Sequence, residues 1–256
     1  MFDHGGAMYE DGSQGASRGA RVEASALTRR FGRHLALDAL SLSIPPGETF
    51  ALLGANGAGK TTFIRLVIGY LVPSAGRVTV DGHSPDVDAQ AVHARVGYVA
   101  ETSRLYPDLR VRSSLRFAAR IHGLSGAAAD AAVDRALARF GLGGVAHRLI
   151  GNLSKGFQQR VSLAQGILHD PPLVVADEPT SGLDPLQQAE VREMFRDLAG
   201  RCTVLLCTHD LGEARALATR VGVLRQGRLV ALGAPADVLG PDLSLELFRS
   251  AEVAAP

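Results

Sequence analysis

The sequence predicts an α/β fold with a mostly parallel sheet, an N-terminal antiparallel β subdomain and an inserted helical subdomain. Short apolar runs alternate with segments of helical spacing, which is typical of parallel sheets. The run at residues 173–176, LVVA, is apolar at every position, as expected of a strand covered on both faces. Between about residues 103 and 168, alanine-rich segments with helical spacing interrupt the α/β pattern and indicate a helical insertion.

The elements can be placed in chain order from these patterns. Residues 22–27 and 35–44 have partly alternating apolar positions and read as strands, and the turn at 45–47, PPG, leads to a strand at 49–53. A helix is expected at about 60–70, and strands at 76–80 and 96–100. The insertion contains helices at 127–140 and 158–168 and another after Arg110, which is a poor capping residue. The last strands are expected at 203–207, 221–225 and 228–232.

Composition and charge limit the classes of function. The chain has 256 residues, 46% of them hydrophobic and 21% charged, which is ordinary for a globular protein with a sizeable core. The net charge of +1 gives no electrostatic case for nucleic acid as a partner. Cys202 and Cys207 are the only cysteines, and both flank or lie in an apolar run. We therefore expect buried, reduced thiols rather than a metal site.

The two ends of the chain differ from its middle. Residues 1–20 are rich in glycine, serine and acidic residues and lack the apolar run of a signal peptide, so they are predicted to be a disordered tail. Residues 241–256 are predicted to be a short C-terminal tail. No stretch approaches 18 apolar residues, so we expect no membrane span within this chain.

The clearest chemical signal is the run GANGAGKT at residues 54–61, which follows an apolar strand. It has the full spacing of a phosphate-binding P-loop, in which backbone N–H groups surround phosphate oxygens at the start of a helix. Glycines let that backbone adopt conformations closed to most residues. Lys60, one of only two lysines in the chain, supplies charge to the β- and γ-phosphates, and Thr61 offers a hydroxyl to Mg²⁺. The alternative is a chance glycine turn before a helix.

Two adjacent carboxylates end the apolar strand at 173–176. At the carboxyl end of a parallel strand, Asp177 and Glu178 face the crevice where ligands bind. In P-loop ATPases the loop hydroxyl and such an acid hold Mg²⁺ together, so we assign Asp177 to the metal and Glu178 to the attacking water. The alternative is a solvated pair of acids at a strand end. With the P-loop, the pair predicts an ATPase that uses ATP and Mg²⁺.

Several further motifs resemble those of ATP-binding cassette (ABC) ATPases. Residues 177–185, DEPTSGLDP, are similar to the family's Walker B and D-loop run, and 153–160, LSKGFQQR, to its signature motif. His209 in the run THD at 208–210 matches the switch-histidine loop, although alone it could equally be structural. Phe31 lies 29 positions before Lys60, where the family carries an aromatic residue that stacks on adenine. The resemblance covers about residues 21–239, and the block 21–240 is the predicted ABC ATPase domain.

The resemblance implies a mechanism and a set of residues. Such domains work as head-to-tail pairs, in which the signature loop of one subunit closes over ATP bound to the P-loop of the other. Glu178, His209 and Lys60 are then catalytic, and Asp184 lies along the seam of the pair. The partner's ATP would be contacted by Ser154, Lys155 and Gly156, and Mg²⁺ by Thr61, Asp177 and Glu101. The ATP-binding residues would be Phe31, Gly54, Ala55, Asn56, Gly57, Ala58, Gly59, Lys60, Thr61 and Thr62.

This chain departs from the family pattern at two places. The Q-loop position is Glu101, which can approach Mg²⁺ or the attacking water but adds negative charge near the phosphates. The signature motif has Lys155 and Phe157 where glycine and glutamine are usual, and Lys155 could steer toward the partner's ATP or be solvated. These departures resemble an exporter-type subgroup that includes ATPases for drug resistance, gliding motility and copper-enzyme processing. Residues 153–165 and 181–185 resemble the gliding-motility type most closely.

The resemblance also implies partners and a location. We expect an ATP-binding and ATP-hydrolysing subunit that powers a separate membrane-spanning permease, for export, from the cytoplasmic face of the inner or cell membrane. A second ABC subunit, identical or a paralogue, completes the pair. Residues 102–109 correspond to the segment that meets the membrane subunit in relatives, with Leu105, Tyr106 and Leu109 expected to be exposed or to pack on the helical insertion. The alternatives are a soluble ABC ATPase that acts on ribosomes or DNA, and a catalytically weak regulatory binder.

Overall fold

The computed structural model describes residues 19–102 and 105–240. The predicted tails at 1–20 and 241–256 lie outside this part of the chain except for Gly19 and Ala20. Ala20 is fully buried, its N–H donates to Pro172 O at 3.0 Å, and its carbonyl accepts from the Thr203 hydroxyl at 2.6 Å. Ordered packing therefore begins before the predicted boundary at residue 21.

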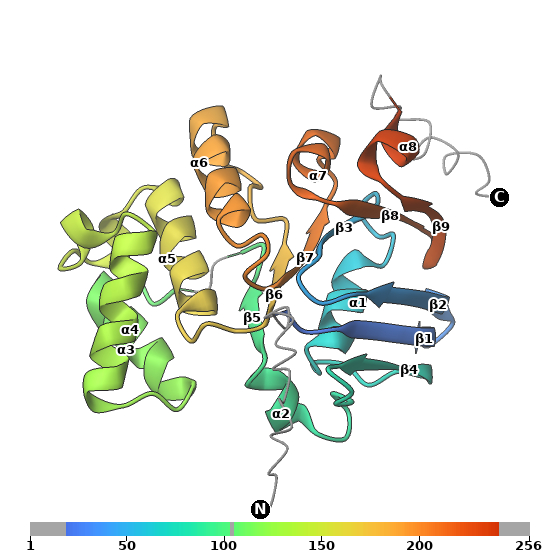
Figure 1. Cartoon of the computed structure of the whole chain (residues 1–256), viewed down its shortest axis with the longest axis horizontal. Helices are drawn as coiled ribbons and strands as arrows, with labels where there is room; N and C mark the ends of the chain where they lie inside the picture. The colour runs from blue at the N-terminus through green and yellow to red at the C-terminus, as the bar shows by residue number, and fades with distance from the viewer. Residues whose placement is uncertain (1–18, 103–104, 241–256) are drawn as a thin grey trace, which may run out of the picture.

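The core of the fold is a six-stranded sheet in the order β5-β6-β7-β3-β8-β9 (Figure 1). All neighbouring strands are parallel except the terminal hairpin of β8 and β9, which confirms the predicted mostly parallel sheet. The strands are β3 Thr49–Leu53, β5 Val96–Val99, β6 Leu173–Asp177, β7 Thr203–Thr208, β8 Arg220–Arg225 and β9 Arg228–Gly233.

Both faces of this sheet are buried, and the side chains of each central strand divide between two hydrophobic clusters. In β6, Val174 and Ala176 enter one cluster, and Leu173 and Val175 enter the other. The alternation follows from the two-residue period of a strand. It explains why the central strands are apolar at consecutive positions rather than at every second one.

The smaller sheet is antiparallel, with the order β2-β1-β4, and confirms the predicted N-terminal β subdomain. Its strands are β1 Val22–Phe31, β2 His34–Ile44 and β4 Ala75–Val80. β1 is longer than predicted because it runs on to Phe31 and pairs there with His34. The inner face of the small sheet packs on α1 (Lys60–Val67), in which Phe63, Ile64 and Leu66 are completely buried. α1 is shorter than the predicted 60–70.

The helical insertion lies at one end of the molecule, away from the small sheet (Figure 1). It contains α3 Val111–Ile121, α4 Gly126–Arg139 and α5 Lys155–Ile167, with short 3₁₀ turns at Gly143–Val145 and Ile150–Asn152. As predicted, Arg110 at the start of α3 makes no side-chain cap. α5 begins earlier than the predicted 158 because the Ser154 side chain caps it, accepting from the Phe157 N–H at 3.4 Å.

The remaining helices are α2 Ala89–His93, α6 Pro185–Arg196, α7 Leu211–Leu217 and α8 Pro235–Leu239. The short helices α2 and α8 were not predicted, because five residues carry too little periodicity to be recognised. Both cysteines are buried and free, as expected, and burial raises the pKa of Cys202 to about 11. Within the described residues, every helix is too short or too polar to cross a bilayer.

Candidate functional site

The P-loop joins the fully buried strand β3 to the first turn of α1. Gly57 and Gly59 adopt left-handed conformations, with φ of +80° and +111°, which glycine accepts without strain. Gly54 does not, so its predicted conformational role is wrong. It is required for space, because a Cβ atom there would lie 2.6 Å from Leu224 O and 2.9 Å from the Ala58 Cβ. The loop is therefore held in shape partly by β8, which packs against its start.

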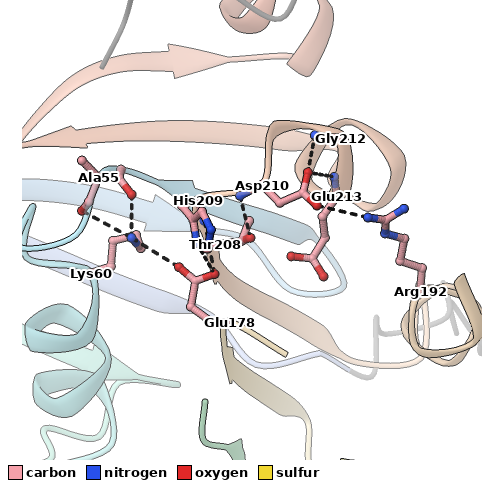
Figure 2. A network of polar contacts seen from close by, with 10 residues as sticks. Ala55, Lys60, Glu178, Arg192, Thr208, His209, Asp210, Gly212 and Glu213 are labelled. Atoms are coloured by element: carbon pink, nitrogen blue, oxygen red, sulfur yellow. Dashed lines mark hydrogen bonds and ion pairs between the residues drawn. The ribbon is translucent and has the colours of Figure 1, made fainter. Parts of the chain in front are cut away.

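Lys60 lies inside the loop with its side chain only 6% exposed. Its Nζ donates to Gly54 O at 2.5 Å and to Ala55 O at 3.4 Å, and lies 3.4 Å from Glu178 Oε1 (Figure 2). A buried ammonium needs such compensation, because leaving a charge unpaired away from water is strongly unfavourable. The arrangement places a compact positive charge where the loop's N–H groups and the start of α1 already favour anions.

Asp177 is the last residue of β6 and is 3% exposed. Burial raises the pKa of its carboxyl group, a hydrogen bond with Thr61 opposes the rise, and Glu178 and Glu101 add to it. Its Oδ1 atom is buried without a hydrogen-bond partner among the described residues. An unpaired carboxylate oxygen beside a threonine hydroxyl fits a hard divalent cation such as Mg²⁺, which one or two protein ligands hold together with substrate phosphates. Asp177 and Thr61 therefore suit the predicted metal role.

Glu178 occupies a strained position directly after β6. Its φ of +47° lies in the left-handed region, which is unfavourable for a non-glycine residue and unusual before a proline. Its N–H donates to Cys207 O at 2.8 Å, which ties the residue to the end of β7. Strain of this kind persists only where the surrounding structure enforces it, and it is concentrated at functional sites.

The carboxylate of Glu178 bridges Lys60 and His209. Its Oε2 atom lies 2.8 Å from His209 Nδ1 and accepts from the His209 N–H at 3.3 Å (Figure 2). A carboxylate only accepts hydrogen bonds, so this contact requires the proton on Nδ1 and leaves Nε2 of a neutral ring free to accept. The His209 side chain is 59% exposed, so the ring can also meet a ligand.

These groups converge on one cavity of about 410 Å³ between the small sheet, the P-loop and the ends of β6 and β7. Glu101 lines it, as does Phe31, which is 42% exposed and has the Arg29 guanidinium 4.6 Å from its ring centre. Of the predicted site residues, those that line it are Phe31, Ala55, Asn56, Gly57, Gly59, Lys60, Thr61, Thr62, Glu101, Asp177, Glu178 and His209.

Three lining residues were not predicted to belong to the site: His34, Ala36 and Ser181. His34 follows Phe31 across the β1–β2 turn and pairs with it, so the hairpin itself could have pointed to it. Ser181 lies in the run DEPTSGLDP, three residues after Glu178, but no role in the site was predicted for it. The predicted residues Gly54 and Ala58 belong to the loop without lining the cavity.

The signature turn does not contribute to this cavity. Ser154 and Lys155 are exposed at the start of α5, and Gly156 packs against Gln187 of α6. Asp184 is an exposed residue that caps α6, accepting from the Gln187 N–H at 3.0 Å. These four predicted site residues therefore form a second group, on the side of the molecule occupied by α5 and α6 (Figure 1).

Comparisons with known proteins show which sequences this chain resembles. The sequence profile of the family described as ABC transporter matches residues 37–181. Nod factor export ATP-binding protein I of Paraburkholderia xenovorans is 36% identical over 231 residues, which cover 90% of this chain and 76% of that protein. YbhF of Escherichia coli, named as a probable multidrug ABC transporter ATP-binding protein, is 36% identical over 218 residues, which cover 85% of this chain and 38% of that protein.

Solved structures give the same result. The structure of cbiO1 from Clostridium perfringens, described as part of the ABC transporter complex cbiONQ, has a TM-score of 0.79 and 27% identity over 87% of this chain and 91% of that one. A structure described as the ATP-binding subunit of an ABC transporter has a TM-score of 0.77 and 30% identity over 85% of this chain and 91% of that one. All four proteins are named as parts of transport systems or for export, in agreement with the transport function expected from the sequence.

Proposed function

We propose that two copies of this chain, or this chain and a paralogue, bind ATP between them to drive a separate membrane-spanning subunit. The premise is that the chain belongs to the ABC transporter family as an ATP-binding and ATP-hydrolysing subunit. The observation that carries the proposal is the separation of the two groups of site residues. Lys60, Glu178 and His209 meet at one cavity, whereas Ser154 and Lys155 are exposed outside it. A second subunit is then needed to bring a signature turn to the nucleotide.

The phosphates would lie in the P-loop, with the Lys60 ammonium near the β- and γ-phosphates and the base of ATP on the Phe31 ring. Asp177 and Thr61 would hold Mg²⁺, which neutralises phosphate charge when it is bound. The exposed carboxylate of Glu101 also lines the cavity and would approach the metal or the attacking water.

Glu178 would accept the proton of the attacking water, and the strained backbone of this residue fixes where its carboxylate lies. His209 would hold the water and the γ-phosphate in line through Nε2, because its Nδ1 is engaged by Glu178. Both side chains therefore have geometric support for the roles that the sequence predicts.

The partners follow from the family and the exposed surfaces. We propose a second ABC subunit along the surface of Ser154, Lys155 and Asp184, and a membrane-spanning permease as a separate chain, with the pair acting at the cytoplasmic face of the inner or cell membrane. Relatives named for Nod factor export and multidrug transport support an exporter. The gliding-motility and copper-processing assignments stay predictions.

The proposal is tested by asking whether the variant Glu178→Gln forms a dimer that depends on ATP. This variant keeps the size of the side chain and an oxygen to accept from His209, but it removes the base, which contributes about 10²–10⁴-fold to the rate. We expect it to retain ATP, to hydrolyse it very slowly and to elute as a dimer from a sizing column only when ATP and Mg²⁺ are present. Glu193→Gln, on the exposed face of α6, is the matched control. Turnover of Glu178→Gln at the wild-type rate would contradict the assignment of the base.

A further inference from the structure

Glu213 is a completely buried carboxyl group in the first turn of α7, with no place in the mechanism above. Its exposed fraction is 0%, and neither carboxylate oxygen has a full hydrogen-bond partner among the described residues. Burying a carboxyl group without full partners is unfavourable. A buried polar group in this condition therefore calls for an explanation.

Two buried threonines lie next to this carboxyl group. The hydroxyls of Thr208 and Thr180 interact with it and lower its pKa, which opposes the larger rise caused by burial, although neither hydroxyl has the geometry of a full hydrogen bond. The charged groups that act on it are Asp210, which raises the pKa, and Arg192, which lowers it. Figure 2 shows the Glu213 side chain beside the loop that carries Thr208, His209 and Asp210.

The positions of the two threonines in the chain connect them to the reaction. Thr208 ends β7 and directly precedes His209, and Thr180 lies two residues after Glu178. The Thr208 hydroxyl accepts from the Asp210 N–H at 3.0 Å, so its proton is available to Glu213. The Glu213 carboxyl group therefore lies between the segment that carries the base and the segment that carries the switch histidine.

The segment of Glu178 needs such support. The backbone of Glu178, at φ +47°, is held by two hydrogen bonds. The Glu178 N–H donates to Cys207 O at 2.8 Å, and the Ser181 N–H donates to Glu178 O at 3.0 Å. Both bonds act on the backbone alone. A displacement of the carboxylate by about 1 Å is enough to slow a reaction by about 10²-fold.

We propose that Glu213 is a positioning residue for ATP hydrolysis, in which its buried carboxyl group joins Thr180 to Thr208 and so fixes Glu178 relative to His209. The inference rests on the proposed function, because it assigns Glu213 to the same reaction. Glu213 is not among the residues that line the cavity. It acts only through the two segments that it joins.

The first experiment compares the steady-state ATPase kinetics of wild type, Glu213→Gln and the exposed control Glu193→Gln. The amide replaces one of the two acceptor oxygens by an NH₂ group that can only donate, so we expect kcat to fall about tenfold for Glu213→Gln while KM for ATP changes by less than about twofold. The control should match wild type. Wild-type kcat in a folded Glu213→Gln protein would overturn the inference, as would a loss confined to KM.

A double-mutant cycle separates positioning from a structural effect. If Glu213 acts through the Glu178–His209 pair, adding Glu213→Gln to His209→Ala should lower kcat little further. A tenfold further loss in that background would overturn the inference.

A second variant covers the case in which Glu213→Gln does not fold. Thr180→Val removes one hydroxyl and preserves the shape of the side chain, and it should also lower kcat without raising KM for ATP. Wild-type kcat in Thr180→Val would then overturn the inference. Failure of the wild-type protein to hydrolyse ATP at all would instead contradict the proposed function.

Discussion

Replacing Lys60 by alanine should weaken ATP binding by about 10²–10⁴-fold. The side chain is 6% exposed, and its Nζ lies within 3.4 Å of Gly54 O, Ala55 O and Glu178 Oε1. A hydrogen bond to a charged group contributes about 1.5–3 kcal/mol. Contacts with two phosphates therefore contribute about 3–6 kcal/mol, which is about 10²–10⁴-fold in affinity. The variant also leaves the Glu178 carboxylate without its cation beside the phosphates, which adds to the loss.

The assay is calorimetric titration of the purified protein with ATP and with ADP. Because Lys60 is assigned to both the β- and γ-phosphates, the loss should be larger for ATP than for ADP. Lys60→Met preserves the packing volume and should behave in the same way. Arg135→Ala is the matched control, since it removes an exposed cation of α4 that does not line the cavity and has no place in the proposed site. Wild-type affinity for ATP in Lys60→Ala and Lys60→Met would refute the assignment of the loop.

Two other predictions concern the helical subdomain. Tyr106 is 57% exposed, and its ring packs edge-on against Phe117 with 6.0 Å between the ring centres; we expect it to contact the membrane subunit. Tyr106→Ser should therefore abolish transport in vesicles and leave basal ATP hydrolysis intact. Normal transport by this variant would contradict the prediction. Burial and the stacked His122 ring lower the pKa of His169 to about 4 from 6.5. The folded state therefore favours the neutral ring, and stability present above pH 6.5 should be lost as the pH falls toward 4. Urea unfolding should show that His169→Asn flattens this loss, and an unchanged pH slope would contradict it.

Much of the fold followed from patterns that are local in the sequence. The P-loop strand and β6 were recognisable because their apolar runs are followed by residues with special chemistry, the glycine-rich loop before Lys60 in the first case and Asp177 in the second. The helical insertion was recognisable from its change of period. The unpredicted helices α2 and α8 are short and depend on packing against the rest of the chain rather than on their own sequence.

The site was less fully predictable, because several of its features arise from contacts distant in sequence. The role of Gly54 depends on Leu224 O, which the fold brings from β8. The left-handed conformation of Glu178 runs against the usual preference of a residue before proline. Leu105 was expected to be exposed or to pack on the helical insertion, and it is partly buried against the hydrophobic cluster that includes the buried residues of the insertion, in agreement with the second alternative.

The central claim is that one ATP lies between Lys60 of one subunit and Ser154 of its partner, and mixing two inactive variants tests it most directly. Lys60→Ala disables the P-loop, and Ser154→Arg places a bulky side chain on the exposed signature turn. Each variant alone should lack ATPase activity, while a mixture should recover up to about a quarter of the wild-type rate, because half of the dimers are mixed and each mixed dimer has one intact site. No recovery in a mixture shown to contain mixed dimers, or full activity of Ser154→Arg alone, would contradict the shared site.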